Sequence, residues 1–379
     1  MPDVKKLSAV LSGTATLREI RQQPGVWRDT AKILRERRTA LDAFLAPLLA
    51  RQDARIVLTG AGTSAFIGQI AAASLGRRFE AVATTELVSH PAVYLPQDVP
   101  TLLVSFARSG DSPESTAATE LADRLVRDVS HLIVTCNPDG ALNRAHESRP
   151  GSFVLLMPER SLDDGFAMTS SFTAMLLSVL LAFRGDDEAV VDALAAGAEQ
   201  LLAQEERIAQ LAATVPQRIV YLGGGPLVGL ARESALKTLE LTGGQVVAYY
   251  DSPLGFRHGP KAVLDAHSVA VVYGSADPYS AAYDEDIVRE LRASIGQDRV
   301  LTVSAGAQSS AEGTDWVLAG LEGLDDAYLA VAYVVFAQLF ALYCSAALGL
   351  TPDNPFPDGD VNRVVKGVII HPLIETSRR

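Results

Sequence analysis

The stretch "RIVLTGAGTSAFIG" (residues 55–68) runs from an apolar strand through glycines into the start of a helix. A second stretch, "RIVYLGGGPLVGLA" (residues 218–231), repeats this pattern in the other half of the chain. Around both, short apolar runs alternate with helical patterns, which is typical of βαβ units and a mostly parallel sheet. We therefore expect an α/β fold of two tandem, doubly wound domains, each with a mostly parallel sheet flanked by helices.

The expected domain organisation follows from this repetition. Residues 46–205 form the first domain and residues 206–350 the second, with a helical connection near residue 200. Residues 1–45 are helical and charged and form an N-terminal arm. Residues 351–379 are rich in Pro, Asp and Gly and form a C-terminal tail. The second strand of the first domain is expected within "FEAVATTE" (residues 79–86).

Composition excludes several classes of protein. With 48% hydrophobic and 21% charged residues, the 379-residue chain has the profile of a soluble globular protein. The net charge is −12 and no basic run is interleaved with aromatics, which argues against nucleic-acid binding. Two distant cysteines, Cys136 and Cys344, argue against a disulfide scaffold or a cysteine metal site and indicate a cytoplasmic protein.

One apolar run, residues 327–350, is long enough to span a membrane. It follows the acidic "EGLDD" and contains Gln338, so we expect a buried helix and no membrane association.

The loop after the first strand carries candidate ligand-binding residues. Ligands of open α/β sheets bind at the carboxyl ends of the strands, where Gly62, Thr63 and Ser64 lead into a helix. These residues suit a phosphate held by hydroxyls and backbone N–H groups. The glycine spacing also fits a dinucleotide fingerprint with Glu86 as the ribose-binding acid, and a simple helix cap explains Thr63 or Ser64 alone. The motif favours phosphate and leaves the other two interpretations open.

Two further clusters of hydroxyl residues follow. In "SFARSGDSPES" (residues 105–115), Ser109 and Ser112 lie beside Arg108 before a helix. Such a loop can bind a phosphate monoester without a P-loop lysine. "MTSSFT" (residues 168–173) adds Ser170 and Ser171 at another helix start.

Acid–base candidates lie in the second half of the chain. In "ARESALKTLEL" (residues 231–241), Glu233, Lys237 and Glu240 share one helix face. The local pattern permits either a solvated ion-pair ladder or two carboxylates and an amine directed at a substrate. His258 lies in the glycine-rich "FRHGPKAV" and is either an exposed bystander or a proton shuttle to a sugar ring oxygen. No metal-binding histidine spacing accompanies it.

The motifs "GAGTSA", "SFARSGDSPES", "ARESALKTLEL" and "FRHGPKAV", in this order, resemble the sugar isomerase (SIS) domain family, in particular the isomerase half of glucosamine-6-phosphate synthase. "GFAMTSS", "YDSPLGFRHGPK" and "VNRVVKGVIIHP" are similar to AgaS-type proteins, which act as galactosamine-6-phosphate deaminases or tagatose-6-phosphate ketose/aldose isomerases.

The resemblance assigns roles to matching positions. It implies that Glu240 moves a proton between C1 and C2, that Glu233 positions Lys237, and that His258 opens the sugar ring from a neighbouring subunit. A tail lysine, Lys366, would lie near the open-chain sugar as the tail closes over the site. The phosphate-binding positions are Gly62, Thr63, Ser64, Ser109 and Ser112. Where the family has a serine and a glutamine, this chain has Ala107 and Arg108, so a hydroxyl is lost and a cation is gained.

The expected function is the conversion of galactosamine 6-phosphate to tagatose 6-phosphate and ammonia by a homodimer or larger homo-oligomer. The chain opens Met-Pro-Asp without the cysteine nucleophile of a glutaminase half, which favours ammonia release over synthesis. No metal or organic cofactor is expected, because the mobile proton lies next to a carbonyl-like carbon. The alternatives are a ketose–aldose isomerase, a glucosamine-6-phosphate deaminase, a sugar-phosphate deglycase and a non-catalytic sugar-phosphate sensor.

Overall fold

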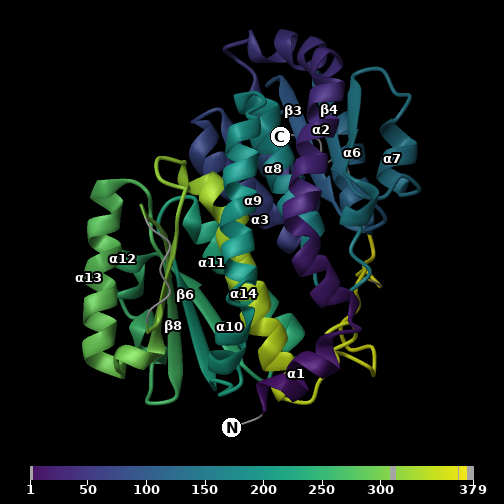
Figure 1. Cartoon of the computed structure of the whole chain (residues 1–379). Coiled ribbons are helices and arrows are strands. Elements are labelled where there is room, and N and C mark those ends of the chain that lie inside the picture. Colours follow the sequence, from purple (N-terminus) through teal and green to yellow (C-terminus); the bar gives the residue numbers. More distant parts are fainter. Residues whose placement is uncertain (1–2, 308–312, 366, 374–379) are drawn as a thin grey trace.

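The computed structural model describes residues 3–307, 313–365 and 367–373. Two sheets face each other across a shared layer of helices, and further helices cover their outer faces (Figure 1). All pairings in both sheets are parallel, which confirms the expected α/β fold with two doubly wound domains.

The first sheet has the order β2-β1-β3-β4-β5 and the second the order β10-β9-β8-β6-β7. Counted from the first strand of each half, the two orders are the same. The strands of the first sheet are β1 (Arg55–Thr59), β2 (Phe79–Ala81), β3 (Thr101–Ala107), β4 (Val129–Thr135) and β5 (Ser152–Leu156). Those of the second are β6 (Arg218–Leu222), β7 (Val247–Asp251), β8 (Ser268–Tyr273), β9 (Val300–Ala305) and β10 (Asp315–Leu318).

The helices of the N-terminal half are α1 (Val4–Leu11), α2 (Ala15–Leu49), α3 (Thr63–Leu75), α4 (Thr84–Ser89), α5 (Pro91–Tyr94), α6 (Pro113–Leu125), α7 (Ala141–His146) and α8 (Ser170–Arg184). They are followed by α9 (Glu188–Leu202), α10 (Glu205–Ala212), α11 (Leu227–Leu241), α12 (Pro253–Phe256), α13 (Pro278–Ile295) and α14 (Asp326–Ala347). Short 3₁₀ turns occur at Glu159–Ser161, Pro260–Val263 and Gln297–Arg299.

The helices between the sheets join the two halves into one hydrophobic core. Helix α11 packs against both α3 and α14, and α14 also packs against α9 (Figure 1). Helix α14 is long and apolar enough to cross a membrane by length and composition, but its apolar window is completely buried inside the protein. The expectation of a buried helix is confirmed, because the surrounding helices supply the apolar environment.

Of the helices of residues 1–45, α2 lies mainly against the first domain, whereas α1 packs against α10 and α14. Trp27, Leu34 and Leu41 of α2 are fully buried, and α2 packs along α8 and α9. Asp353 accepts hydrogen bonds from the Ala15 and Thr16 backbone N–H groups, so the first part of the tail is held at the start of α2. The division of the chain at residues 45, 205 and 350 stays a prediction.

The segment 79–86 differs from the expectation of one strand. Strand β2 ends at Ala81, and α4 begins at Thr84, whose N–H donates to the Gly60 carbonyl at 2.8 Å. Helix start is favoured here because Glu86 falls in the first turn, where a carboxylate complements the helix dipole.

Candidate active site

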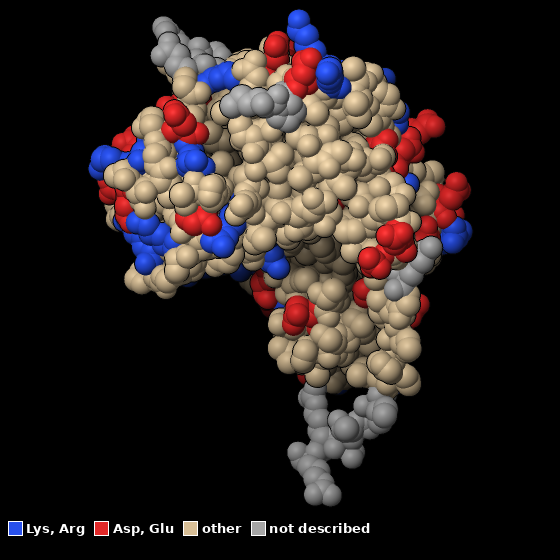
Figure 2. All heavy atoms as spheres, turned by 90° about the horizontal axis from the view of Figure 1, so that it is seen from below, with Lys and Arg blue, Asp and Glu red and all other residues tan. Residues whose placement is uncertain are grey.

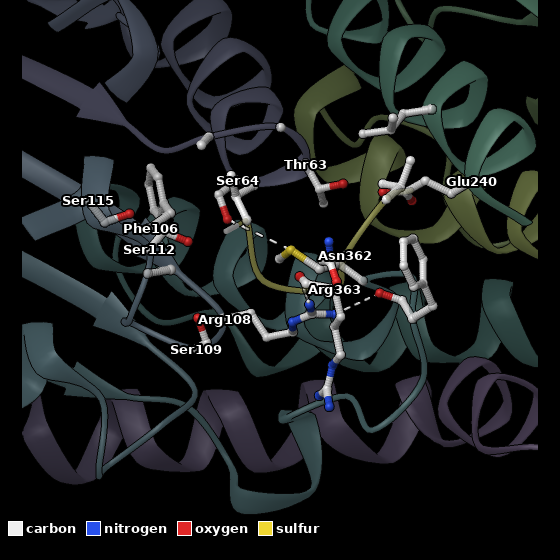
Figure 3. Close-up of a pocket in the computed structure, with 18 residues that line it drawn as sticks. Thr63, Ser64, Phe106, Arg108, Ser109, Ser112, Ser115, Glu240, Asn362 and Arg363 are labelled. Atoms are coloured by element: carbon white, nitrogen blue, oxygen red, sulfur yellow. Dashed lines mark hydrogen bonds between the residues drawn. The ribbon is translucent and has the colours of Figure 1, made fainter. Parts of the chain in front are cut away.

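A cavity of about 250 Å³ lies at the carboxyl ends of β1 and β3. The chain moves to one side of the sheet after β1 and to the other after β3, so this is the switch point at which open α/β sheets bind ligands. Five segments line the cavity: the β1–α3 turn, the β3–α6 loop, the loop 166–168, helix α11 and the tail segment 361–365 (Figure 3). Both domains and the tail therefore contribute to one cavity.

The β1–α3 turn brings a helix N-terminus to the cavity. Gly62, with φ 55°, adopts a left-handed conformation that favours glycine, and Thr63 and Ser64 then open α3. No side chain caps this helix, and the Thr63 and Ser64 hydroxyls lie in the cavity lining. The capping interpretation of these residues is therefore wrong.

The β3–α6 loop brings a second helix N-terminus to the same cavity. Ser109, Ser112 and Ser115 line it, and no side-chain hydrogen bond from the Ser112 N-cap occupies the start of α6. Two uncapped helix starts with several hydroxyls provide the donors and the positive dipole ends that a phosphate requires. Glu86, the acid of the dinucleotide interpretation, lies on α4, half-exposed, and does not line the cavity.

Arg108 lines the cavity and forms hydrogen bonds to two separate backbone segments. Its Nη1 donates to the Phe166 carbonyl at 3.0 Å and its Nη2 to the Arg363 carbonyl at 2.8 Å (Figure 3). Burial lowers the pKa of the guanidinium, and the neighbouring Arg363 lowers it further. The side chain thus holds the tail against the loop 166–168.

The polar face of α11 is buried, so it is not a surface ladder. Glu233 and Lys237 are 0% exposed, whereas Glu240 reaches the cavity. The Lys237 Nζ lies 3.5 Å from Glu233 Oε1, donates to Thr63 Oγ1 at 3.1 Å, and forms an ion pair with Glu240 Oε2. Lys237 therefore connects helix α11 of the second domain to the β1–α3 turn of the first.

The protonation of this group follows from its burial. Burial raises the pKa of Glu233 to about 8, and neither of its carboxylate oxygens has a hydrogen-bond partner among the described residues. Burial alone would lower the pKa of Lys237, but Glu233 and Glu240 outweigh it, and the pKa is raised above its ordinary value. Burial thus disfavours a charge on Glu233, and the Lys237–Glu240 ion pair is the part of the group that reaches the cavity.

This arrangement can bind an anion at one end and transfer a proton at the other. Within the described residues, no three His, Cys, Asp or Glu side chains form a group that could hold a metal ion. The polar groups on the cavity include hydroxyls and helix starts, which can donate hydrogen bonds, and the Glu240 carboxylate, which accepts them.

Comparisons with known proteins identify the family of this chain. Residues 48–184 match the model of the SIS domain. An AgaS protein of Streptomyces coelicolor is 57% identical over 371 residues, which is 96% of each chain. The chain belongs to the SIS domain family, among the AgaS-type proteins.

Two further AgaS-type relatives carry names that describe an activity. D-galactosamine-6-phosphate deaminase AgaS of Shewanella sp. is 43% identical, over 95% of this chain and 92% of that protein. The crystal structure of tagatose-6-phosphate ketose/aldose isomerase from Escherichia coli superposes with a TM-score of 0.87 at 43% identity, covering 95% of this chain and 97% of that chain.

The cavity at the carboxyl ends of β1 and β3 contains most of the site residues predicted from the sequence. Gly62, Thr63, Ser64, Arg108, Ser109, Ser112 and Glu240 line it, and Lys237 and Glu233 lie behind Glu240. His258 is exposed in the turn after α12 and does not line the cavity of this single chain. Lys366 lies outside the described residues.

Ser170 and Ser171 lie outside the cavity lining, and the structure gives their side chains internal partners. The Ser170 hydroxyl donates to the Glu19 carbonyl at 2.7 Å, and the Ser171 hydroxyl donates to Asp163 at 2.5 Å. Asp163 also accepts from the Thr169 N–H and the N–H groups of both serines, so it caps the start of α8. A substrate role for these two serines does not fit, because buried acceptors already use their hydroxyls.

Sequence reasoning missed the apolar side and the tail of the site. Phe166, Met168 and Leu236 line the cavity together with the tail residues Val361, Asn362, Arg363 and Val365. The first two lie in the AgaS-type motif "GFAMTSS", and the tail residues open "VNRVVKGVIIHP", so the motifs signalled these segments without assigning individual contacts. Spacing could not do so, because each contact depends on how distant segments pack.

Proposed function

We propose that this chain converts galactosamine 6-phosphate to tagatose 6-phosphate and ammonia. The observation that carries the proposal is the single cavity that holds two uncapped helix starts, hydroxyls and the Glu240 carboxylate paired with Lys237. The names of the AgaS-type relatives support the substrate, since close homologues are called D-galactosamine-6-phosphate deaminases.

The reaction follows from these groups. The phosphate binds at the hydroxyls of Thr63, Ser64, Ser109 and Ser112 and at the starts of α3 and α6. His258 of a neighbouring subunit assists ring opening, which exposes the C1 aldehyde. Glu240 removes the proton from C2 and returns it at C1, while the C2 amine loses a proton and O1 gains one, so C1 becomes CH₂OH and the amine becomes an imine. Water adds to the imine and ammonia leaves, giving the ketose. Lys366 acts beside the open-chain sugar.

The charge of Lys237 assists the proton transfer from C2 to C1 by Glu240. Lys237 forms an ion pair with Glu240 and so holds a positive charge beside the carboxylate that is to accept the C2 proton. Glu233 lies on the far side of Lys237 and positions it.

The proposal includes a cytoplasmic homo-oligomer that completes each site with His258 of a partner subunit and binds neither nucleic acid nor membrane. The distribution of charged side chains on the surface supports the proposed absence of nucleic-acid binding. On the face shown in Figure 2, basic and acidic side chains are interspersed around a broad uncharged area, without one large basic patch.

A second candidate activity is the isomerisation of tagatose 6-phosphate without ammonia release, because the Escherichia coli structure that this chain resembles carries that name. The two activities share the proton transfer between C1 and C2.

The test is a panel of galactosamine 6-phosphate, glucosamine 6-phosphate and tagatose 6-phosphate, assayed for ammonia and ketose together. Equal amounts of ammonia and tagatose 6-phosphate from galactosamine 6-phosphate are expected. Glu240→Gln should lower turnover about 10²- to 10⁴-fold, the usual contribution of a general base, while Glu206→Gln on exposed α10 should not. Near-normal deamination by the Glu240 variant would refute the assignment.

A further inference from the structure

Four buried polar side chains lie beneath the β1–α3 turn and the β3–α6 loop and have no role in the proposed chemistry. Thr59 is 0% exposed, Thr84 1%, Ser105 2% and Glu114 8%. Within the described parts of the chain, Thr59 Oγ1, Thr84 Oγ1, Ser105 Oγ and Glu114 Oε2 are buried atoms without a hydrogen-bond partner.

Strand register places two of them side by side. Thr59 of β1 and Ser105 of β3 are direct partners in the parallel ladder. Two residues earlier, Val57 and Leu103 belong to the small apolar cluster on the outer face of the sheet. Because strand side chains alternate between faces, Thr59 and Ser105 continue this cluster toward the carboxyl ends of the strands.

Helix periodicity brings the other two to the same layer. Leu87 of α4 and Ala118 of α6 belong to the same outer cluster, and α4 packs against α6. Thr84 precedes Leu87 by three residues and Glu114 precedes Ala118 by four, so each lies on the sheet-facing side of its helix. The Thr84 N–H also donates to the Gly60 carbonyl, next to Thr59.

These four groups are costly in their present state. A buried hydroxyl or carboxylate oxygen without a partner loses its hydration and gains no hydrogen bond in exchange, which is unfavourable. Glu114 is also in the first turn of α6, whose N-terminus faces the anion-binding cavity. A carboxylate there repels a bound phosphate unless a cation lies beside it.

We propose that Thr59, Thr84, Ser105 and Glu114 form a binding site for a monovalent cation, ammonium or potassium, directly beneath the phosphate-binding loops. All four groups can accept at once, and together they carry one negative charge. One carboxylate with three hydroxyls matches a single positive charge, whereas calcium sites draw on several carboxylates and carbonyls. Ammonium offers four N–H donors to four acceptors, and potassium has a similar size.

The cation in this site neutralises Glu114 and strengthens phosphate binding above it. This cation site does not depend on the proposed deaminase reaction. The four residues lie on the face of the first sheet that α4 and α6 cover, whereas Glu240 reaches the cavity from α11.

The experiment compares ammonium chloride, potassium chloride and choline chloride at equal ionic strength. We expect ammonium or potassium, but not choline, to raise the unfolding temperature of the full chain. Inorganic phosphate should bind about five- to tenfold more tightly with the small cation, as expected for one unit charge acting on another through partly buried protein. The ammonium and potassium arms identify the preferred ion.

Glu114→Gln keeps the shape and removes the charge, so it should abolish the dependence on cation identity. Glu120→Gln on the exposed side of the same helix is the matched control and should retain it. Thr59→Val provides a second variant if Glu114→Gln does not fold, and anomalous diffraction from rubidium-soaked wild-type crystals should give a peak among the four oxygens.

Identical unfolding temperatures in all three salts, or a cation dependence that survives in Glu114→Gln, would overturn the proposal. So would crystals with no rubidium peak at this position. A wild type that responds to potassium but lacks deaminase activity would instead reject the proposed function and retain this site.

Discussion

The two halves of the molecule begin with the same strand–glycine–helix turn and use it for different purposes. A Cβ on Gly60 would come within 2.6 Å of Ser64, and one on Gly223 within 2.6 Å of Leu227, so both turns need glycine for the same close approach of strand and helix. After that approach the first turn presents hydroxyls to the cavity. The second inserts Leu227, fully buried, into the core.

A cavity also lies at the carboxyl ends of β8 and β9 in the second domain, and the Asp284 carboxylate lines it. Asp284 accepts from the Ser275 N–H, and Asp326 accepts from the Ser275 hydroxyl and the Ala276 N–H. Burial raises the pKa of Asp284 to about 6. The comparison teaches that the two halves share one topology, while the strand ends present hydroxyls in the first half and carboxylates in the second.

The largest expected effect comes from removing the residue that joins the two halves. Lys237→Met leaves Glu233 and Glu240 without their buried cation, so the free energy of unfolding should fall by about 3–5 kcal/mol and activity should be lost. Denaturant titration measures the first effect. Lys261→Met, which removes a partly exposed partner of Glu290, should cost no more than about 1 kcal/mol. Equal stability of the two variants would contradict the role given to Lys237.

A reciprocal pair tests the divergence of the two turns. Leu227→Ala should lower the free energy of unfolding by about 2–5 kcal/mol through the cavity it leaves, without weakening phosphate binding. Ser64→Ala should weaken sugar-phosphate binding about tenfold, because a hydrogen bond to a charged group is lost, with little change in stability. Calorimetric titration and thermal unfolding of both variants give the comparison. A loss of binding in Leu227→Ala with none in Ser64→Ala would reverse our assignment.

The pH dependence of folding stability gives a further difference between the domains, because the first contains a buried pair of histidines. The ring centroids of His131 and His146 lie 4.8 Å apart with the planes tilted by 50°, and burial lowers the pKa of His146 to about 4, with His131 and Arg149 contributing. Between about pH 6.5 and pH 4 the unfolded chain therefore binds a proton that the folded chain excludes, and stability falls as the pH falls, by about 1.4 kcal/mol per unit of pKa shift.

His146→Asn should remove this dependence, so the stability difference from wild type should shrink as the pH is lowered through that window. Exposed His267 of the second domain offers the control, His267→Asn, which should leave the slope unchanged. A wild-type slope that persists in His146→Asn would place the proton uptake elsewhere.

The smallest expected effect concerns the tail that covers the first domain's turns. Arg108→Lys cannot hold both the Phe166 and Arg363 carbonyls, so the tail should open more often and trypsin should cleave after Arg363 about three- to tenfold faster. Arg289→Lys on exposed α13 serves as the control. An unchanged cleavage rate in Arg108→Lys would show that other contacts hold the tail.

The alternation of apolar runs with helical patterns determined the fold from the sequence. Parallel strands buried on both faces are largely apolar, as in β3, and the repeated "RIVLTG" and "RIVYLG" turns marked both domains. The sequence also identified the hydroxyl loops, because ligand sites of such folds lie at the carboxyl ends of strands. It failed where a local pattern had two meanings, as at residues 79–86, where a short edge strand gives way to a helix.

Only the tertiary structure decided which polar groups share a site. Ser64 and Ser170 are both serines near helix starts, yet one lines the cavity and the other bonds the Glu19 carbonyl. Local spacing favoured a solvated ladder for Glu233 and Lys237, whereas α3 and α14 bury this part of α11 completely. Periodicity records which residues share a face, but the protonation and partners of that face depend on what packs against it, and only the folded chain brings those segments together.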